Sequence, residues 1–438
     1  MPNPFQWTEA DRVKRRLGAS GEDQRQAYQR DRDRILYCSA FRRLAGITQI
    51  VRADEADVFH TRQQHSMKVA QVGRRLAEKC IHDQPKESEL LGLHPEVVEA
   101  ACLAHDLGHP PFGHVGEHTL HEKVTEHDPD GFEGNAQSFR ILTKLAVRFA
   151  KDPGLDLTRA TLAAVLKYPW TRSTTIPGRD QKWSAYTSEQ ADFDFARELF
   201  SHSSKTAEAE LMDWSDDIAY SVHDLEDFHR CAALPWTRIL DESGTERMVE
   251  RAEAKWWDKP SDALARLRNA CRRLVGLLKE TFPELITAPY EGTRGQRQQL
   301  RTLTSMLIGR YIRAARLKNP DDIEADDVCI DVAADAVDEV RILKQITRDY
   351  IIDTPSLAAQ QKGQRRILQE LFDDLHNDSK TTFPAYLPIR LRYLWDDEQH
   401  KARFAADCVA SLTESEAIAL HARLHGTASG SVLDPIVR

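Results

Sequence analysis

The sequence predicts a mainly α-helical protein, and three observations carry that prediction. Proline and glycine are sparse, at 19 and 20 residues in a chain of 438. Apolar residues recur at helical spacing: Val69, Val72 and Leu76 lie 4, 7 and 11 positions after a histidine at position 65, on one face of a helix. Alternation of apolar and polar residues, which indicates a half-buried strand, is rare and short. We therefore expect an all-α fold.

The composition excludes several classes of protein. The formal charge is −9, the mean hydropathy is −0.54, and no apolar stretch approaches the roughly 20 residues of a membrane span. The first residues, MPNPFQWTEADRVKRR, lack the apolar region of a secretory signal. Seven cysteines without a Cys-x-x-Cys pair argue against a disulfide framework or a zinc ribbon. We expect a cytoplasmic protein with no membrane partner, and the mild acidity argues against a general nucleic-acid coat.

The distribution of histidines divides the chain. We expect an N-terminal arm running into a helix (1–37), a histidine-rich helical core (38–230), a C-terminal helical region packed on that core (231–425) and a flexible tail (426–438). Within the core, residues 127–135 and 171–190 read as loops. The second loop is long for a compact domain, and such loops often serve as lids or binding segments.

The dipeptide His105-Asp106 stands at the end of an apolar helix that Gly108 and two prolines must terminate. Adjacent helical residues point about 100° apart, so both can reach one ion only if it lies against the helix end. Further ligands must come from other helices, and His65 and Asp216 are the natural candidates. Imidazole and carboxylate together suit Mn, Fe, Co, Ni or Zn, so the ligands alone do not choose the metal.

Simpler interpretations compete with a metal site. An isolated His-Asp pair in a helical protein is most often a capped or salt-bridged surface pair. His118 with His121 and Glu122 resembles metalloprotease spacing but lacks the His-Glu-x-x-His order, so we interpret these residues as surface. Other histidines, namely His60, His82, His202 and those near the C-terminus, receive no role.

Six segments nevertheless resemble one family. In chain order they are FRRLAGITQI, FHTRQQHSMKVAQVGR, ACLAHDLGHPPFGHVGE, FEGNAQSFRIL, LKYPW and DDIAYSVHDLEDF. Their content and order, from about Arg30 to Phe228, are similar to those of the HD-domain deoxynucleoside triphosphate triphosphohydrolases, the dGTPase-like branch. The resemblance implies a helical HD-domain core that carries a metal-dependent phosphohydrolase site.

The resemblance also implies the ligands of a divalent ion. They are His65, His105, Asp106 and Asp216. Asp216 is preferred to Asp217 because the family places a Tyr four and an Asp eight residues beyond its ligand, as Tyr220 and Asp224 stand here. These offsets lie along one helix face. The ion would be Mn²⁺, Mg²⁺, Co²⁺, Ni²⁺ or Fe²⁺, with a further Mg²⁺ accompanying the substrate triphosphate.

Matching family positions imply a nucleotide pocket. Tyr220 would pack on the sugar where a ribose 2′-OH projects, while Asp224 and Gln49 would contact the 3′-OH. The candidates for phosphate contacts are Arg62, His109, Lys167 and Tyr168. Alternatives remain open: Tyr220 as ordinary aromatic core, Lys167 and Tyr168 as a solvated Lys beside a core Tyr, and His109 as a structural side chain in the proline turn.

His114 and Glu117 match the family's catalytic pair. Their spacing of three brings them together if Gly113 starts a helical turn. Imidazole titrates near neutral pH, and a carboxylate can fix its orientation, so the pair suits proton transfer.

The expected activity is therefore metal-dependent hydrolysis of dGTP or several dNTPs to deoxynucleoside and tripolyphosphate. The family also implies a homo-oligomer, a tetramer or hexamer, and a nucleotide or single-stranded DNA as a possible effector. Two rivals stay open: another HD-domain nucleotidase or phosphodiesterase, and a nucleic-acid-binding or regulatory HD protein. The C-terminal half follows the family less closely, since Glu414 and Glu416 replace a usual Asp and Tyr.

Overall fold

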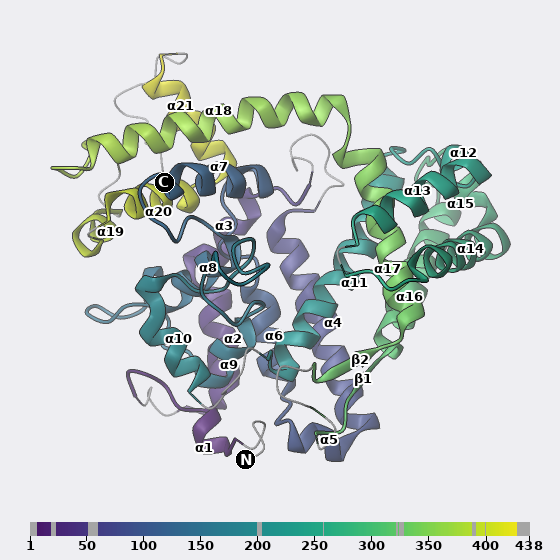
Figure 1. Ribbon diagram of the computed structural model, residues 1–438, viewed down its shortest axis with the longest axis horizontal. Coiled ribbons are helices and arrows are strands. Elements are labelled where there is room, and N and C mark those ends of the chain that lie inside the picture. Colours follow the sequence, from purple (N-terminus) through teal and green to yellow (C-terminus); the bar gives the residue numbers. More distant parts are fainter. Residues whose placement is uncertain are drawn as a thin grey trace.

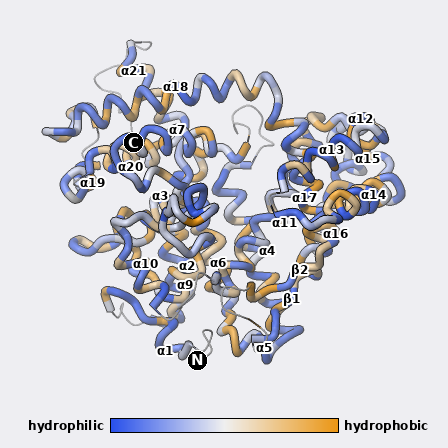
Figure 2. The backbone as a smooth tube through the Cα atoms, viewed as in Figure 1, coloured by the Kyte–Doolittle hydropathy of each residue, from blue (hydrophilic) through white to orange (hydrophobic). Residues whose placement is uncertain are grey.

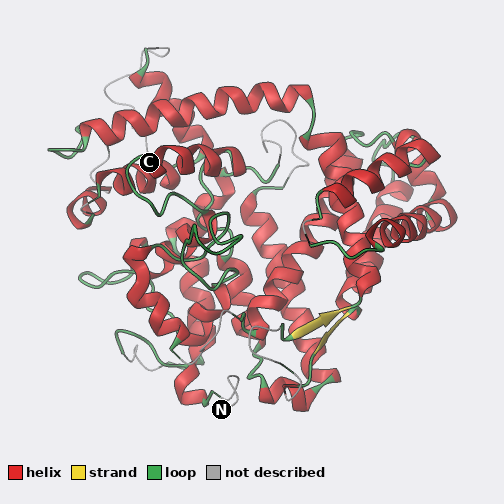
Figure 3. Ribbon diagram, in the orientation of Figure 1, coloured by secondary structure: helices red, strands yellow, loops and turns green. Residues whose placement is uncertain are grey.

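The computed structural model is helical almost throughout, as expected from the sequence (Figures 1 and 3). It describes residues 7–18, 23–50, 60–198, 204–256, 258–320, 323, 328–387, 391–398 and 400–426. Of the tail expected at 426–438, only Gly426 belongs to these residues. The all-α prediction is confirmed, and the boundaries assigned to the four regions stay a prediction.

The first half of the chain forms the helices up to α11. They are α1 (Glu9–Arg12), α2 (Ala27–Tyr37), α3 (Ser39–Arg43), the 3₁₀ helix η1 (Leu44–Gly46), α4 (Arg62–Asp83), α5 (Pro85–Leu90), α6 (Pro95–Ala104), α7 (His114–Thr125), α8 (Gly134–Arg140), the π-helix η2 (Ile141–Leu145), α9 (Arg159–Val165), the 3₁₀ helix η3 (Thr187–Glu189), α10 (Gln190–Arg197) and α11 (Ala207–Arg230). The expected loops at 127–135 and 171–190 lie between α7 and α8 and between α9 and α10, but each ends in helix: residues 134–135 belong to α8, and residues 187–190 belong to η3 and the start of α10.

The second half begins with a group of helices and ends with four more, of which the first and the third pack against α7. The elements are α12 (Trp236–Ile239), α13 (Glu242–Ala254), α14 (Ala263–Thr281), α15 (Pro283–Thr287), α16 (Arg294–Arg313), β1 (Ala315–Leu317), β2 (Ile330–Val332), α17 (Ala334–Thr347), the π-helix η5 (Arg348–Ile352), α18 (Pro355–Asp378), α19 (Arg392–Asp397), α20 (Lys401–Ser411) and α21 (Glu414–Leu424). The two strands pair antiparallel, with Arg316 opposite Asp331.

The main core lies where α4, α6 and α11 pack against one another. The helical stripe expected on α4 is buried, with Val69, Val72 and Leu76 at 1% exposure or less. Because α6 is apolar around most of its circumference, α2, α4, α9 and α11 cover it. Hydrophobic residues in Figure 2 accordingly gather on inner helices such as α6, whereas α18 is mainly hydrophilic.

A second cluster joins the end of the chain to α7. Phe112 and Leu120 pack there with Phe372 of α18 and Phe404 of α20. The long helix α18 runs across the top of Figure 1, beside α7, α20 and α21. The C-terminal region therefore contributes to both clusters, since α17 belongs to the main core and α18 to the second.

Two further expectations can be compared with the structure. Among the described helices, none has the length and apolar character that crossing a bilayer requires. All seven cysteines lie in the described part of the chain, and all carry free thiols.

Candidate active site

The first turn of α4 carries two of the candidate residues. Thr61 caps this helix: its hydroxyl accepts a hydrogen bond from the backbone N–H of Gln64, and the Gln64 side chain accepts from the N–H of Thr61. This capping box satisfies donors that a helix start otherwise leaves free. It fixes the position of Arg62 and His65, which lie three residues apart on one face and are both buried.

The helix α6 ends at Ala104, and His105 is its C-terminal cap, as the following glycine and prolines predicted. Gly108 is required there, because a Cβ atom would lie 2.2 Å from the carbonyl oxygen of Gly134 and 2.3 Å from the backbone nitrogen of Ser138. Ser138 also donates its hydroxyl to the carbonyl of His105 and accepts from the N–H of Gly108. The turn after α6 is thus held tightly against α8.

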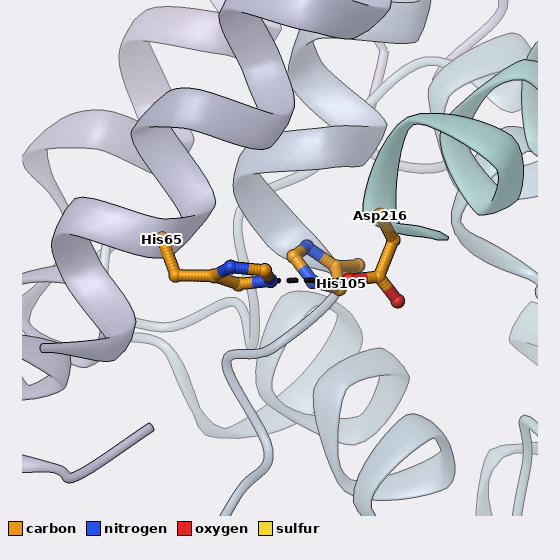
Figure 4. Close-up of side chains that lie close together, drawn as sticks. All are labelled: His65, His105 and Asp216. Atoms are coloured by element: carbon orange, nitrogen blue, oxygen red, sulfur yellow. Dashed lines mark hydrogen bonds and ion pairs between the residues drawn. The ribbon is translucent and has the colours of Figure 1, made fainter. Parts of the chain in front are cut away.

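Three potential metal ligands meet from three helices (Figure 4). His65 comes from α4, His105 from the end of α6 and Asp216 from α11, and one donor atom of each lies within 4.8 Å of the others. Oδ1 of Asp216 lies 3.1 Å from Nε2 of His65 and 3.6 Å from Nε2 of His105. Residues distant in the sequence therefore present two imidazoles and a carboxylate to one point.

Asp106 borders this group. Its Oδ1 lies 3.5 Å from Nε2 of His105 and 3.0 Å from Nδ1 of His109, and its Oδ2 accepts a hydrogen bond from Arg62 at 2.9 Å. Burial raises the pKa of Asp106, but His105, Arg62 and His109 lower it well below its usual range. The group is therefore an anion able to serve as a fourth ligand.

The hydrogen bonding of His105 fits a metal ion. Nδ1 lies 2.6 Å from the backbone carbonyl of Cys102, so the proton on this nitrogen is donated to that oxygen. Nε2 is buried, makes no hydrogen bond to any described residue and faces the carboxylates of Asp106 and Asp216. Burial lowers the pKa of His105, yet Asp106 and Asp216 outweigh it and raise the pKa to about 9, so the two carboxylates favour a positive charge at this position, and a metal ion would take the place of the proton on Nε2. Fixing one ring nitrogen by a backbone carbonyl is characteristic of metal-bound histidines.

Lysine side chains complete the charge balance on α11. Lys167 contacts Oδ2 of Asp216 at 3.0 Å and Oδ1 of Asp213 at 2.9 Å. Asp213 also pairs with Lys205 at 2.6 Å. Burial raises the pKa of Asp216, but Lys167 and His105 depress it well below the ordinary value, so this ligand also stays ionised.

The pair His114 and Glu117 stands at the start of α7. Gly113, with φ of +58°, caps the helix in a backbone conformation that favours glycine, so the expected helical turn begins there. Nδ1 of His114 lies 2.9 Å from Oε2 of Glu117, and the His114 side chain is 68% exposed. Glu117 also accepts from Lys182 at 2.7 Å. The buried carboxylate thereby orients an accessible imidazole.

His109 connects the two groups. Its ring lies 5.4 Å from the ring of His114, and its Nδ1 contacts Asp106. Burial and the nearby Arg62 lower its pKa to about 4, so His109 is neutral at neutral pH.

A cavity of about 460 Å³ joins these features. Eleven of the thirteen site residues expected from the sequence line it: Gln49, Arg62, His65, His105, Asp106, His109, His114, Lys167, Tyr168, Asp216 and Tyr220. Glu117 stands behind His114. Asp224 is buried on α11 outside the lining; its Oδ2 makes no hydrogen bond to described residues, and burial, Asp227 and Asp216 raise its pKa well above the usual value.

Comparison with known proteins agrees with this arrangement. A model of the HD domain matches residues 62–142, and a model described as a phosphohydrolase-associated domain matches residues 330–423. A deoxyguanosinetriphosphate triphosphohydrolase-like protein of Streptomyces coelicolor is 37% identical over 421 residues, which cover 92% of this chain and 93% of the relative. Similarly named proteins of Bifidobacterium longum and Vibrio vulnificus are 33% and 29% identical, over 91% and 92% of this chain and 83% and 93% of theirs.

The chain belongs to the deoxyguanosinetriphosphate triphosphohydrolase-like family. It is thus an HD-domain phosphohydrolase, as the sequence motifs indicated. The matched HD domain includes Arg62, His65 and the His105-Asp106 pair, whereas Asp216 follows it on α11.

The sequence did not predict several residues that surround the HD site. Lys182, which holds Glu117, lies in the 171–190 loop, whose length was the only signal. Asp213 stands just before the DDIAYSVHDLEDF segment and precedes Asp216 by one helical turn. Others come from the phosphohydrolase-associated domain: Lys344 of α17, Ile352 of η5, and Leu357 and Gln361 of α18 all line the cavity. No sequence motif marked these four.

Proposed function

We propose that this protein hydrolyses deoxynucleoside triphosphates at the α-phosphorus, releasing a deoxynucleoside and tripolyphosphate. One observation carries the proposal: a single cavity is lined by the His/Asp donor group, by Arg62 and Lys167, by Tyr220 and by the exposed imidazole of His114. Metal ligands, phosphate-binding cations, an aromatic ring and a proton-transfer group are the components that this reaction needs.

The donor set suits a divalent ion. His65, His105, Asp106 and Asp216 would hold it, and such an ion supplies Lewis-acid polarisation of the phosphoryl oxygens. The unpaired Nε2 of His105 and the two ionised carboxylates support this assignment.

The protein's own side chains then position the substrate. Arg62 binds an oxygen of the α-phosphate, while its contact with Asp106 keeps the guanidinium in place. Lys167, His109 and Tyr168 border the same part of the cavity and bind the phosphate chain. Phosphoryl transfer mostly needs this kind of positioning and charge neutralisation.

The proton balance assigns a role to His114. Water attacks the α-phosphorus in line, the bond from phosphorus to the 5′-oxygen breaks, and that oxygen must gain a proton as the deoxynucleoside leaves. His114 transfers the proton, because its ring is accessible from the cavity and Glu117 fixes its orientation.

Tyr220 accounts for the preference for a deoxyribose. Its ring lines the cavity one helical turn beyond Asp216, so the sugar would lie against the aromatic face beside the metal ligands. A ribose 2′-OH would meet this ring. Gln49 borders the same cavity, and its buried Oε1 makes no hydrogen bond to described residues, which leaves it available to the 3′-OH.

Product analysis tests the cleavage site. The purified protein is incubated with each dNTP and NTP, with Mn²⁺ or Mg²⁺, and the products are separated by ion-exchange chromatography. We expect tripolyphosphate and deoxynucleoside in equal amounts. Diphosphate with dNMP, or phosphate with dNDP, would contradict the proposal. In ¹⁸O-labelled water the label should enter tripolyphosphate, and label in the nucleoside would exclude attack at phosphorus.

A further inference from the structure

A second group of imidazoles and carboxylates lies between α18 and α21, two helices that meet at the top of Figure 1. Glu370 and Asp374 stand four residues apart on α18, and His421 and His425 stand four residues apart at the end of α21. Residues at this spacing lie on one helix face. Two helices thus present two pairs of potential ligands to each other, with no member in the catalytic cavity.

The distances within this group suit one ion. Oε2 of Glu370 lies 2.5 Å from Nε2 of His421 and 3.9 Å from Nδ1 of His425, and one donor atom of each of these three residues lies within 4.8 Å of the others. Ligand atoms around a tetrahedral zinc ion, with bonds of ~2.0–2.1 Å, are about 3.3 Å apart. The observed separations fall on both sides of that value, so small side-chain rotations would bring the three atoms to a common ion.

His425 is also oriented as a metal-bound imidazole would be. Its Nε2 lies 3.0 Å from Oδ2 of Asp374, so a proton on Nε2 is donated to this carboxylate and the lone pair of Nδ1 faces Glu370. A carboxylate that binds the outer nitrogen of a ligating histidine fixes the ring and increases its basicity.

The two histidine rings are stacked beside Glu370. The imidazoles of His421 and His425 are 4.6 Å apart between centroids, with an interplanar angle of 27°. Nε2 of His421 and Nδ1 of His425 both lie near the same oxygen of Glu370, so an ion bound at this point could contact all three side chains.

We propose that Glu370, His421 and His425 bind a divalent transition-metal ion of the zinc class, with Asp374 orienting His425. Mixed imidazole and carboxylate ligands suit zinc, nickel or cobalt better than calcium or magnesium. The site is separate from the candidate catalytic ion and does not depend on the proposed reaction.

The ion would join α18, which borders the catalytic cavity, to α21, which holds two residues of the cavity lining. Glu414, the first residue of α21, accepts hydrogen bonds from the backbone N–H of Thr48 at 2.9 Å, the Thr48 hydroxyl at 2.6 Å and the N–H of Phe112 at 3.2 Å. α18 contributes Gln361 to the cavity. A metal that fixes α21 on α18 therefore stabilises one wall of the cavity from outside it.

Zinc titration of the metal-stripped, full-length protein tests the site. We expect the wild type to bind one more equivalent of Zn²⁺ per chain than His421→Ala, and His82→Ala to match the wild type, because His82 is an exposed histidine of α4 outside both groups. Glu370→Gln preserves the size of the side chain and should also lose one equivalent. Equal zinc binding by the wild type, His421→Ala and Glu370→Gln would overturn the proposal.

Two further measurements separate this ion from the catalytic one. In a His105→Ala background, which removes a candidate catalytic ligand, Zn²⁺ should still raise the melting temperature, and adding Glu370→Gln should abolish that rise. Asp374→Asn should weaken zinc binding by roughly 10–100-fold, as expected for loss of a carboxylate behind a ligating histidine. A melting temperature that Zn²⁺ leaves unchanged in His105→Ala would contradict the site.

Discussion

The side chains on the two walls of the catalytic cavity make different kinds of interaction. On the HD-domain wall, charged side chains hold one another: Arg62 contacts Asp106 at 2.9 Å and Lys167 contacts Asp216 at 3.0 Å. On the wall from α18, Leu357 is apolar, and the Gln361 amide makes no hydrogen bond within the described part of the chain. Charges that stabilise a reacting phosphate must be in place before substrate arrives, whereas a free amide can adjust to its ligand. The first wall therefore suits chemistry and the second suits recognition.

Removing a ligand from the HD-domain wall should have the largest effect. We expect Asp106→Ala to lower kcat by about 10³-fold or more, because a metal contributes several kcal/mol of charge stabilisation and each 1.4 kcal/mol corresponds to a factor of ten. Metal content, measured by mass spectrometry of the purified protein, should fall with activity.

The matched control is Asp152→Ala, since Asp152 is an exposed aspartate outside the cavity. It should retain activity and metal. If Asp106→Ala kept both activity and metal, Asp106 would not be a ligand. Its place on the charged wall would then be due to its ion pairs alone.

The next effect should come from the acid–base pair. Glu117→Gln keeps the shape of the side chain but removes the charge that orients His114, so kcat should fall by about 10²-fold, within the usual range for general acid–base catalysis. Glu122→Gln, an exposed glutamate on the same helix, should behave as wild type. Steady-state kinetics of the two variants measure the difference. Equal kcat values would show that Glu117 does not act through His114.

The difference between the walls also explains what the sequence could predict. Helical periodicity predicted the fold class, because the apolar stripes of α4 and α6 are continuous over several turns. His65 and the His105-Asp106 pair stand in compact motifs beside helix boundaries that glycine, proline and capping residues mark. These local signals identified the part of the chain that supplies the charged wall.

The residues of the wall from α18 stand in no such motif. Gln361 lies in a polar stretch of α18, AAQQKGQ, where nothing distinguishes it from its neighbours. Lys344 reaches the cavity because α17 packs on α11, where it pairs with Asp217, and this contact joins residues 127 positions apart. On the HD-domain side, Lys182 also reaches Glu117 from 65 positions away. Such contacts follow from tertiary packing, which residue spacing does not report.

Tyr220 lies between the walls, with Nζ of Lys344 5.9 Å from its ring centre. If the ring excludes the ribose 2′-OH, Tyr220→Ala should reduce the preference for dNTP over NTP in kcat/KM by about 10-fold, because small steric differences in a pocket are worth this much. Tyr220→Phe keeps the ring and should keep the preference. Competition assays with paired dNTP and NTP substrates measure it. An unchanged preference in Tyr220→Ala would place sugar selection elsewhere.

The smallest effect should come from the recognition wall. Gln361→Leu removes the amide at nearly constant volume, so we expect KM to rise about 5-fold, the free energy of roughly one neutral hydrogen bond, while kcat stays close to wild type. Gln298→Leu, on the exposed side of α16, is the matched control. Measuring all four dNTPs shows whether the amide distinguishes bases: an equal rise in KM for each means that its donor and acceptor adapt to every base. A fall in kcat with KM unchanged would instead assign Gln361 to the chemical step and remove the distinction between the two walls.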